Sequence, residues 1–535
     1  NLNHVNSYTN STQQSQSSQK IFSDGEAQYH RQLWGMHMSK FLDPKTVDAH
    51  GEGSSIPPLP PYDFRNNIAV TPQTFRRELF ILYYDPTADE FQVYIDETKD
   101  KYYAPVYSPT HGRLKIIMPI LTYALRNHFP DRFKGKAGGS SEFIVLFSTG
   151  DCPELDCGCV QKNKRLKHAS HCKNDKFAPI LHFGSVFKDT EILPSLVTMP
   201  IWVHLEPCFL EWQRQGTVCE ELRMRHDVAG VLVGGEDPPV GKQMPFSTWD
   251  SLVPTMIWRG TEFAFLYCLH PGLIHEMEWD RDVAPRVARF GNHARGVMQS
   301  LLDMWDSLTP RMKTVSLSAM ARLDAKEANW ATTPWIDARY TVKENEYGAA
   351  VNSVVQQRYL PFQEYGIAMT SPKMSLAQLS KFKYHLDLGG GGGTTWFGTI
   401  EKLAMPGVLF HHVTSSKDYF HDDLVPWKHF IPVNEDLSNL RVMFDWAESN
   451  SEEARKISEA GTEYVKRRAK PEVMKATYER YFVRSLRAVT YAYQPLEGHP
   501  AKNSLNKWLS KWSQVGRCSG KVKEECVFKN WKVPQ

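Results

Sequence analysis

The pattern of hydrophobic and polar residues is most informative around a run of five glycines at residues 389–393. A short apolar segment precedes the run, and an amphipathic segment with Ile400, Leu403 and Ala404 on one face follows it. This order predicts a strand, a tight loop and a helix. Free backbone N–H groups at the start of such a helix favour a phosphate-sized anion. A flexible linker explains the glycines equally well, because their spacing fits neither the P-loop nor the dinucleotide-binding fingerprint.

The N-terminal half has the pattern of a sheet accompanied by a helix. Residues 79–84 and 91–95 predict a hairpin, and residues 114–128 predict a helix that ends before Pro130. Residues 143–147 are continuously apolar, as in a parallel strand covered on both faces. Further strands are expected at residues 180–187, 199–204 and 229–234.

Asp151 follows the apolar strand at residues 143–147. A carboxylate at the C-terminal end of a buried parallel strand lies where open α/β sheets bind their ligands. There it can act as a general base if it reaches the proton that it removes. An Asx turn before Cys152 and Pro153 is the simpler explanation, and position alone favours it.

The C-terminal half alternates strands with helices, which predicts a doubly wound α/β domain. A strand from Val253 runs into Arg259 and Gly260, and an arginine at a strand end can offer its planar fork of donors to a phosphate. A surface ion pair is the alternative role for Arg259. A helix that Pro310 ends is expected with Val297, Leu301, Trp305 and Leu308 on one face. Further strands are expected at residues 335–341, 408–410 and 426–433, and further helices at residues 376–384 and 442–468. A last helix is expected from Pro471 onward, with Tyr478, Phe482, Leu486 and Val489 on one face.

Length and charge set outer limits. At 535 residues, of which 41% are hydrophobic, the chain can form roughly two to four domains. A net charge of +3 gives no argument for a nucleic-acid or membrane partner. No run of ~18 apolar residues spans a bilayer, and a membrane anchor removed from the N-terminus is compatible with a chain that starts at Asn1. The expected parts are a disordered stem and linker at residues 1–62, domains at residues 63–245 and 246–470, and a helix with a basic tail at residues 471–535.

The nine cysteines are unevenly distributed. Four lie within residues 152–172, and Cys518 and Cys526 lie near the C-terminus, which suits disulfide-tied loops of a secretory protein. The Asn10-Ser11-Thr12 glycosylation acceptor agrees with that compartment. A zinc site is the alternative, with Cys157, Cys159, His168, His171 and Cys172 as its possible ligands. The spacing of these residues matches no common zinc module, so we favour disulfides.

The tail from Ala501 carries eight Lys and Arg residues and two Glu residues, with Cys518 and Cys526 closing a loop. A solvated tail is the default expectation for such a composition. Packing on the first domain and binding of an acidic glycan are the alternatives.

A series of short motifs runs in one order through the C-terminal half. They are Trp258-Arg259-Gly260, Ile336-Asp337-Ala338-x-Tyr340-Thr341, Lys383-Tyr384 with Asp387, the glycine turn, Trp396-x-x-Thr399, Gly407-Val-Leu-Phe410, Asp418-Tyr-Phe420, residues 426–433, residues 436–440 and Ala454-x-x-Ile457-x-x-x-Gly461. Together they resemble glycosyltransferase family 90, which includes protein O-glucosyltransferases and capsule xylosyltransferases, in its plant- and algal-like branch. The resemblance covers about residues 250–461, and residues 143–153 are similar to the family's strand that ends in Asp-x-Pro.

The resemblance implies a GT-B-like fold, with two Rossmann-type domains facing a cleft and a C-terminal helix that crosses back to the first domain. Residues 63–245 then form the acceptor side and residues 246–470 the nucleotide-sugar side. It also implies an inverting transfer of xylose or glucose from a UDP-sugar to a hydroxyl of a glycan or glycoprotein, in the lumen of the Golgi or endoplasmic reticulum. No metal and no further cofactor are expected, and no Asp-x-Asp ends a predicted strand.

By the same resemblance, Asp151 corresponds to the catalytic base. The implied nucleotide-sugar-binding residues are Trp258, Arg259, Gly260, Asp337, Gly392, Gly393, Thr394, Thr395, Trp396, Thr399 and Lys402. The animal branch has an arginine where this chain has Thr399, and plant members have a similar Trp-x-x-Ser motif, so the change marks a branch. Lys402 and Lys417 are candidates to replace that charge. Two other classes remain open: a family member that binds glycan or nucleotide without turnover, and a disulfide-rich interaction protein.

Overall fold

In the computed structural model the chain divides after Pro57 into two units, and every residue described below belongs to the second, Pro58–Gln535. The structure describes, with short gaps inside some ranges, residues 59–63, 79–95, 109–148, 179–186, 196–198, 248–261, 289–342, 362–389, 398–468, 473–519 and 525–528. The strands expected at residues 199–204 and 229–234 lie outside these ranges. None of the helices described is long and apolar enough to cross a membrane.

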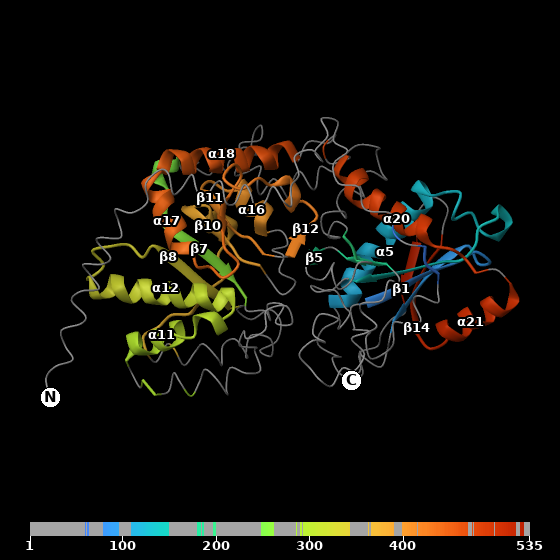
Figure 1. Ribbon diagram of the computed structural model, residues 1–535, viewed down its shortest axis with the longest axis horizontal. Coiled ribbons are helices and arrows are strands. Elements are labelled where there is room, and N and C mark those ends of the chain that lie inside the picture. Colours follow the sequence, from blue (N-terminus) through green and yellow to red (C-terminus); the bar gives the residue numbers. More distant parts are fainter. Residues whose placement is uncertain are drawn as a thin grey trace. The chain divides into compact units, whose positions relative to one another are not determined.

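The first sheet has seven strands in the order β15-β14-β2-β1-β3-β4-β6 (Figure 1). The hairpin predicted from the sequence is present, and Asp85 closes its turn because the carboxylate accepts the Thr87 N–H at 2.8 Å. The strands are β1 (Leu79–Asp85), β2 (Glu90–Ile95), β3 (Phe143–Ser148), β4 (Ile180–His182), β6 (Leu196–Thr198), β14 (Ser513–Ser519) and β15 (Glu525–Phe528).

The strand predicted from the apolar run is β3, and all six of its residues are buried. It is parallel to β4 but antiparallel to β1, so this sheet is parallel across β3, β4 and β6 alone. The predicted helix is α5 (Pro109–His128), which ends before Pro130. The region expected to form one strand at residues 180–187 forms two, because β5 (Gly184–Val186) pairs with β12 (Ser416–Asp418) in a separate two-stranded sheet.

The C-terminal segment completes the first sheet, and the default expectation of a solvated tail is wrong. Strand β14 pairs with β2, and Val515 and Cys518 are buried in the same core as β1 and β3. The Cys518–Cys526 disulfide joins β14 to β15, as the sequence predicted. The preceding elements are a π-helical turn η10 (Tyr478–Val483), α20 (Arg484–Ala492) and α21 (His499–Leu509). The face of η10 and α20 that the periodicity predicted packs into that core, through Tyr478, Phe482, Leu486 and Val489.

The second sheet has six strands, all parallel, in the order β13-β11-β10-β7-β8-β9. With two multi-stranded sheets and helices between the strands, the chain is α/β, as predicted. The strands are β7 (Val253–Gly260), β8 (Ile336–Val342), β9 (Thr370–Pro372), β10 (Phe382–Asp387), β11 (Val408–His412) and β13 (Ile431–Val433).

Helices cover both faces of this sheet (Figure 1). On one face, Met256 and Trp258 of β7 pack with α11 (Ala294–Leu302) and α12 (Pro310–Glu327). On the opposite face, Leu409 of β11 packs with α16 (Gly398–Ala404) and α18 (Ser451–Arg468). The helices are α11 (Ala294–Leu302), α12 (Pro310–Glu327), α15 (Leu376–Leu379), α16 (Gly398–Ala404), α17 (Leu440–Ser449) and α18 (Ser451–Arg468), with short 3-10 turns η5 (Trp249–Ser251), η8 (Trp305–Ser307) and η9 (His421–Asp423).

Two helix predictions in this half need correction. Pro310 does not simply end a helix: it is the first residue of α12, and the Thr309 side chain caps that helix by accepting the Met312 N–H at 3.2 Å. The helix expected at residues 376–384 stops at Leu379, because β10 begins at Phe382 and pairs with β7. Phe382 and Tyr384 of that stretch therefore belong to a strand and not to a helix face.

Gly407 lets the chain turn from α16 into β11. Its φ is +100°, and a Cβ there would lie 2.6 Å from the Lys383 carbonyl oxygen and 2.7 Å from that of Phe382. A side chain is therefore excluded by both backbone conformation and space.

We predict that Gly407→Ala lowers the free energy of unfolding by about 3 kcal/mol or more, because it adds a backbone clash to the cost of a left-handed φ. Gly366→Ala is the matched control, since Gly366 has φ +73° with nothing within 4 Å of its Cβ position, and it should cost about 1 kcal/mol. Urea unfolding measures both. Equal costs would show that the close approach to β10 does not matter.

Candidate active site

The carboxyl ends of the six parallel strands lie along one edge of the second sheet. Open α/β sheets bind their ligands at that edge. Strand β10 ends there with Asp387 and continues into the glycine run, β7 ends at Gly260, and β11 ends at His412. This edge of the sheet is therefore the candidate site.

Asp387 is fully buried and is held by three side chains. Thr399 Oγ1 donates to its Oδ2 at 2.6 Å, Lys402 Nζ lies 2.6 Å from its Oδ1, and His411 Nδ1 lies 3.1 Å from its Oδ2. Burial alone would raise the pKa of Asp387, but the Lys402 ammonium and the hydrogen bond from His411 hold that pKa well below its usual range. The carboxylate is thus ionised and fastens α16 to the ends of β10 and β11.

Thr399 and Lys402, both expected to bind the donor, use their polar groups on Asp387. The Thr399 side chain is buried, and the Lys402 charge is balanced by the neighbouring carboxylate. Their contact with a nucleotide stays a prediction. What the structure adds is that both residues stabilise the junction that leads out of the glycine run.

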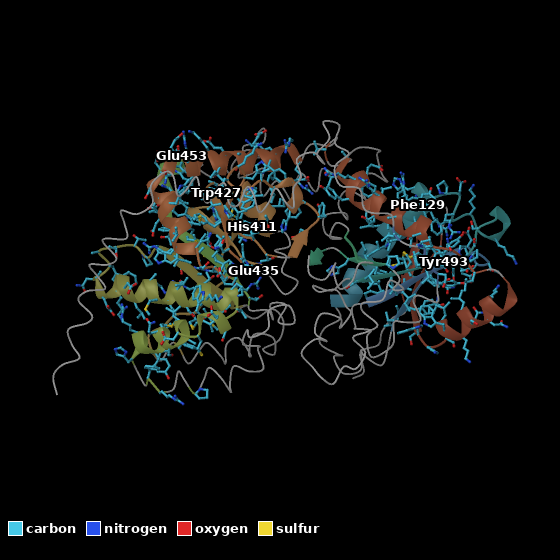
Figure 2. All side chains as sticks on the ribbon, viewed as in Figure 1. Phe129, His411, Trp427, Glu435, Glu453 and Tyr493 are labelled. Atoms are coloured by element: carbon cyan, nitrogen blue, oxygen red, sulfur yellow. A yellow bond between two sulfur atoms is a disulfide. The ribbon has the colours of Figure 1, made fainter. Side chains whose placement is uncertain are left out.

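His412 positions the first residue of the glycine run. Its Nδ1 accepts the Gly389 N–H at 3.4 Å, and its Nε2 lies 2.8 Å from the Glu435 carbonyl oxygen. Burial lowers the pKa of His412 to about 4, so the ring is neutral near pH 7 and donates from Nε2. Figure 2 labels His411, which lies in β11, and Glu435, which follows the end of β13.

Arg311, which the sequence reasoning missed, joins the ends of two strands. The guanidinium donates to the Thr261 carbonyl, to Gly389 O at 3.1 Å and to Leu388 O at 3.5 Å, and it lies 5.6 Å from the centre of the Trp258 ring. It is the second residue of α12, so the Thr-Pro pair at the start of that helix was the signal that could have located it.

Arg259 does not stand free at its strand end. Its Nη2 lies 2.7 Å from Asp337 Oδ2, and its Nη1 donates to the carbonyls of Asp337 and Trp258 at 2.6 and 2.9 Å. Two further arginines, Arg322 of α12 and Arg339 of β8, also contact Asp337, at 3.1 and 2.7 Å from Oδ1. Burial would raise the pKa of Asp337, but Arg259 and Arg339 lower it, so this carboxylate is ionised.

Trp258 and Gly260, also expected at the site, are close neighbours. The Trp258 side chain is buried in the sheet core, and a Cβ on Gly260 would lie 2.5 Å from its ring. Glycine is therefore required for the chain to pass the indole. The remaining expected site residues lie outside the described residues; they are Asp151, Gly392, Gly393, Thr394, Thr395 and Trp396.

Among the residues that the structure describes, no group of three or more His, Cys, Asp and Glu side chains could hold a metal ion. The cysteines between residues 152 and 172 lie outside that set, so the choice between disulfides and zinc there stays a prediction.

Comparisons with known proteins give a family-model match that includes β8, β10 and β11 of this site but not β7 or Arg311. The family model of glycosyl transferase family 90 matches residues 318–486. Protein O-glucosyltransferase 2 of Danio rerio is 34% identical over 85 residues, which are 16% of this chain and 17% of that protein. Protein O-glucosyltransferase 1 of Homo sapiens is 31% identical over 87 residues (16% and 21%), and protein O-glucosyltransferase 3 of Homo sapiens is 29% identical over 110 residues (19% and 20%).

The second sheet and its helices form an α/β domain, and the ends of its parallel strands carry the candidate site. Residues 318–486 match the model of glycosyl transferase family 90, in agreement with the resemblance seen in the motifs. The aligned segments span about a fifth of the length of the curated relatives.

We predict that Lys402→Met costs about 3–5 kcal/mol of unfolding free energy, because it leaves the buried Asp387 carboxylate without its cation. The double variant Asp387→Asn/Lys402→Met should cost less than Lys402→Met alone, since it removes the unpaired charge. Arg455→Met, which breaks an exposed pair with Glu452 at 2.8 Å, is the control and should change stability little. Additive costs in urea unfolding would contradict a coupled pair.

We also predict that stability falls as the pH is lowered from about 6.5 to 4. Burial lowers the pKa of His385 and of His412 to about 4, so between that value and the unfolded value the unfolded chain binds protons that the folded chain excludes. Each such histidine costs about 2 kcal/mol at pH 5 relative to pH 7.

His412→Gln should remove one of these two contributions and flatten the stability profile measured by urea unfolding at each pH. Thr309→Val is the control, because it removes the side-chain cap of α12 without removing a titratable group, so it should lower stability without changing the slope. A wild-type profile that is flat between pH 7 and pH 5 would exclude neutral buried rings.

Proposed function

We propose that this chain is an inverting, metal-independent glycosyltransferase that moves xylose or glucose from a UDP-sugar to a hydroxyl of a glycan or glycoprotein. The observation that carries the proposal is the family 90 match over residues 318–486, which contain Asp337, Asp387 and the glycine run. The relatives reported above are named protein O-glucosyltransferases. That name supports a glucose donor and a protein acceptor, and capsule-type relatives in the family support xylose.

The second sheet serves as the nucleotide-sugar side of a GT-B-like enzyme in this proposal. Its parallel strands, its glycine segment after β10 and its cationic side chains near the end of β7 support that role. The first sheet then carries the acceptor side. Burial of η10 and α20 in the first core supports the crossing C-terminal helix of that fold.

Asp151 is the proposed general base. It lies three residues after Ser148, the last residue of β3, and all six residues of that strand are buried. It takes the proton from the acceptor hydroxyl while that oxygen attacks the anomeric carbon from the face opposite the leaving diphosphate. One bond forms, the bond from carbon to diphosphate oxygen breaks, and the single displacement inverts the configuration.

The leaving diphosphate gains charge in the transition state and needs donors or cations held ready for it. Arg259 supplies positive charge, and the backbone N–H groups of residues 393–399 supply donors. The Arg259 guanidinium is held in place by Asp337 and by two carbonyls, so no reorganisation is required to position it.

The secretory lumen, in the Golgi or endoplasmic reticulum, is the proposed compartment. The Cys518–Cys526 disulfide supports it, because disulfides persist in oxidising compartments. Glycans and glycoproteins are the acceptors available there.

The test is transfer or hydrolysis across a panel of UDP-sugars, with and without a chelator. We expect one preferred donor and no loss with chelator. Asp151→Asn should abolish turnover while UDP binding stays, because the base acts on the acceptor and not on the donor; Asp131→Asn, at an exposed carboxylate, is the control.

Turnover retained in Asp151→Asn would remove that residue as the base. No turnover with any donor, while UDP still raises the melting temperature, would favour a non-catalytic binding member. Neither effect would favour a disulfide-rich interaction protein.

A further inference from the structure

Three arginines share one carboxylate on the second sheet. Arg259 of β7, Arg322 of α12 and Arg339 of β8 all contact Asp337, whose Oδ2 receives Arg259 and whose Oδ1 receives the other two. Arg259 and Arg339 are register partners on neighbouring parallel strands, so their side chains leave the sheet on the same face. The cluster therefore comes from three separate elements that converge on one point.

The positive charge of the cluster exceeds its negative charge by two. Three guanidiniums surround one ionised carboxylate. The other ion pair described at the candidate site, Asp387 with Lys402, has no net charge and so does not offset this excess. Burial, and after it the charge of Arg339, lower the pKa of Arg322 to about 10. Such an excess in a partly buried place favours an anionic ligand.

The three arginines differ in exposure and in how many of their N–H donors are already hydrogen-bonded. Arg259 is 8% exposed; its Nη2 donates to the Asp337 carboxylate, and its Nη1 donates to the carbonyls of Trp258 and Asp337. Arg322 is 13% exposed and donates to Ser318, to the Ala368 carbonyl and to Asp337. Arg339 is 26% exposed and donates from Nε to Asp337; its two terminal nitrogens make no hydrogen bond to any residue that the structure describes.

We propose that Arg339 is the residue of this cluster that contacts a phosphate-type dianion, with Arg259 supplying charge behind it and Asp337 and Arg322 acting as positioning residues. Asp337 holds Arg339 by Nε, which leaves the edge of the planar guanidinium formed by its two terminal nitrogens for a two-point contact with phosphate oxygens. Resting on the proposed function, the ligand is the diphosphate of the UDP-sugar. Arg259, expected from the sequence to make that contact, has its terminal donors already in use.

The experiment measures binding of UDP and of inorganic pyrophosphate to the full chain by calorimetry. Arg339→Gln should weaken both by about tenfold or more, the loss expected for a charge-assisted two-point contact. Arg339→Lys keeps the charge but not the fork, so it should weaken binding less. Arg441→Gln is the matched control, because it removes an exposed arginine that pairs with Asp445 on α17, and it should bind as wild type.

Unchanged binding in Arg339→Gln, with wild type binding both probes, would overturn this inference and leave the proposed function intact. Pyrophosphate binding that depends on Arg339, without turnover of any UDP-sugar, would support the anion site and count against the proposed function. A wild-type chain that binds neither probe would overturn the anion site. Melting temperatures confirm that each variant is folded, and Arg339→Lys decides the question if Arg339→Gln does not fold.

Discussion

The ion pair between Asp387 and Lys402 is the contact on which the candidate site depends. A carboxylate with no exposed surface is tolerated because an ammonium, a hydroxyl and an imidazole satisfy it at 2.6–3.1 Å. The carboxylate belongs to β10 and its three partners to α16 and β11, so the contacts that neutralise the charge also fix the strand end, the following helix and the next strand. The glycine run between β10 and α16 is anchored at both ends by it.

A second set of contacts holds the same edge from the other side of the sheet. Arg311 and His412 bond to the backbone of Leu388, Gly389 and Thr261, using α12 and β11 as supports. Backbone atoms in a glycine segment have no side chains to pack, so their position has to come from neighbours. Side chains on rigid elements supply that position more reliably than the loop itself.

Local patterns were sufficient for most of the elements near the site. Alternating and continuous apolar runs located β1, β2, β3, β7 and β11, and the glycine run correctly separated a strand from a helix. Errors arose where two signals competed. Pro310 indicates a helix end because proline stops helices, although Thr309 before it marks a start. The helix predicted at residues 376–384 is correct to Leu379 and wrong from Phe382, because so few apolar residues do not distinguish the helical period from the strand period.

The charge network was beyond the reach of the sequence. Asp337 and Arg339 are two residues apart, but Arg259 and Arg322 reach them from other elements, and no local spacing predicts which arginine keeps free donors. The motif Trp258-Arg259-Gly260 correctly pointed to the strand end, yet the partner of Arg259 followed only from the pairing of β7 with β8. Pairings of this kind depend on register, which a motif does not encode.

Strand β14 has a consequence for how the protein is made. It lies between β2 and β15, so the hairpin that forms early in the chain keeps an unpaired edge until residues 513–519 have been synthesised. An unpaired strand edge is a template for association with other chains. The first sheet is thus completed last and not first, and β2 keeps an open edge while the residues between it and β14 are synthesised.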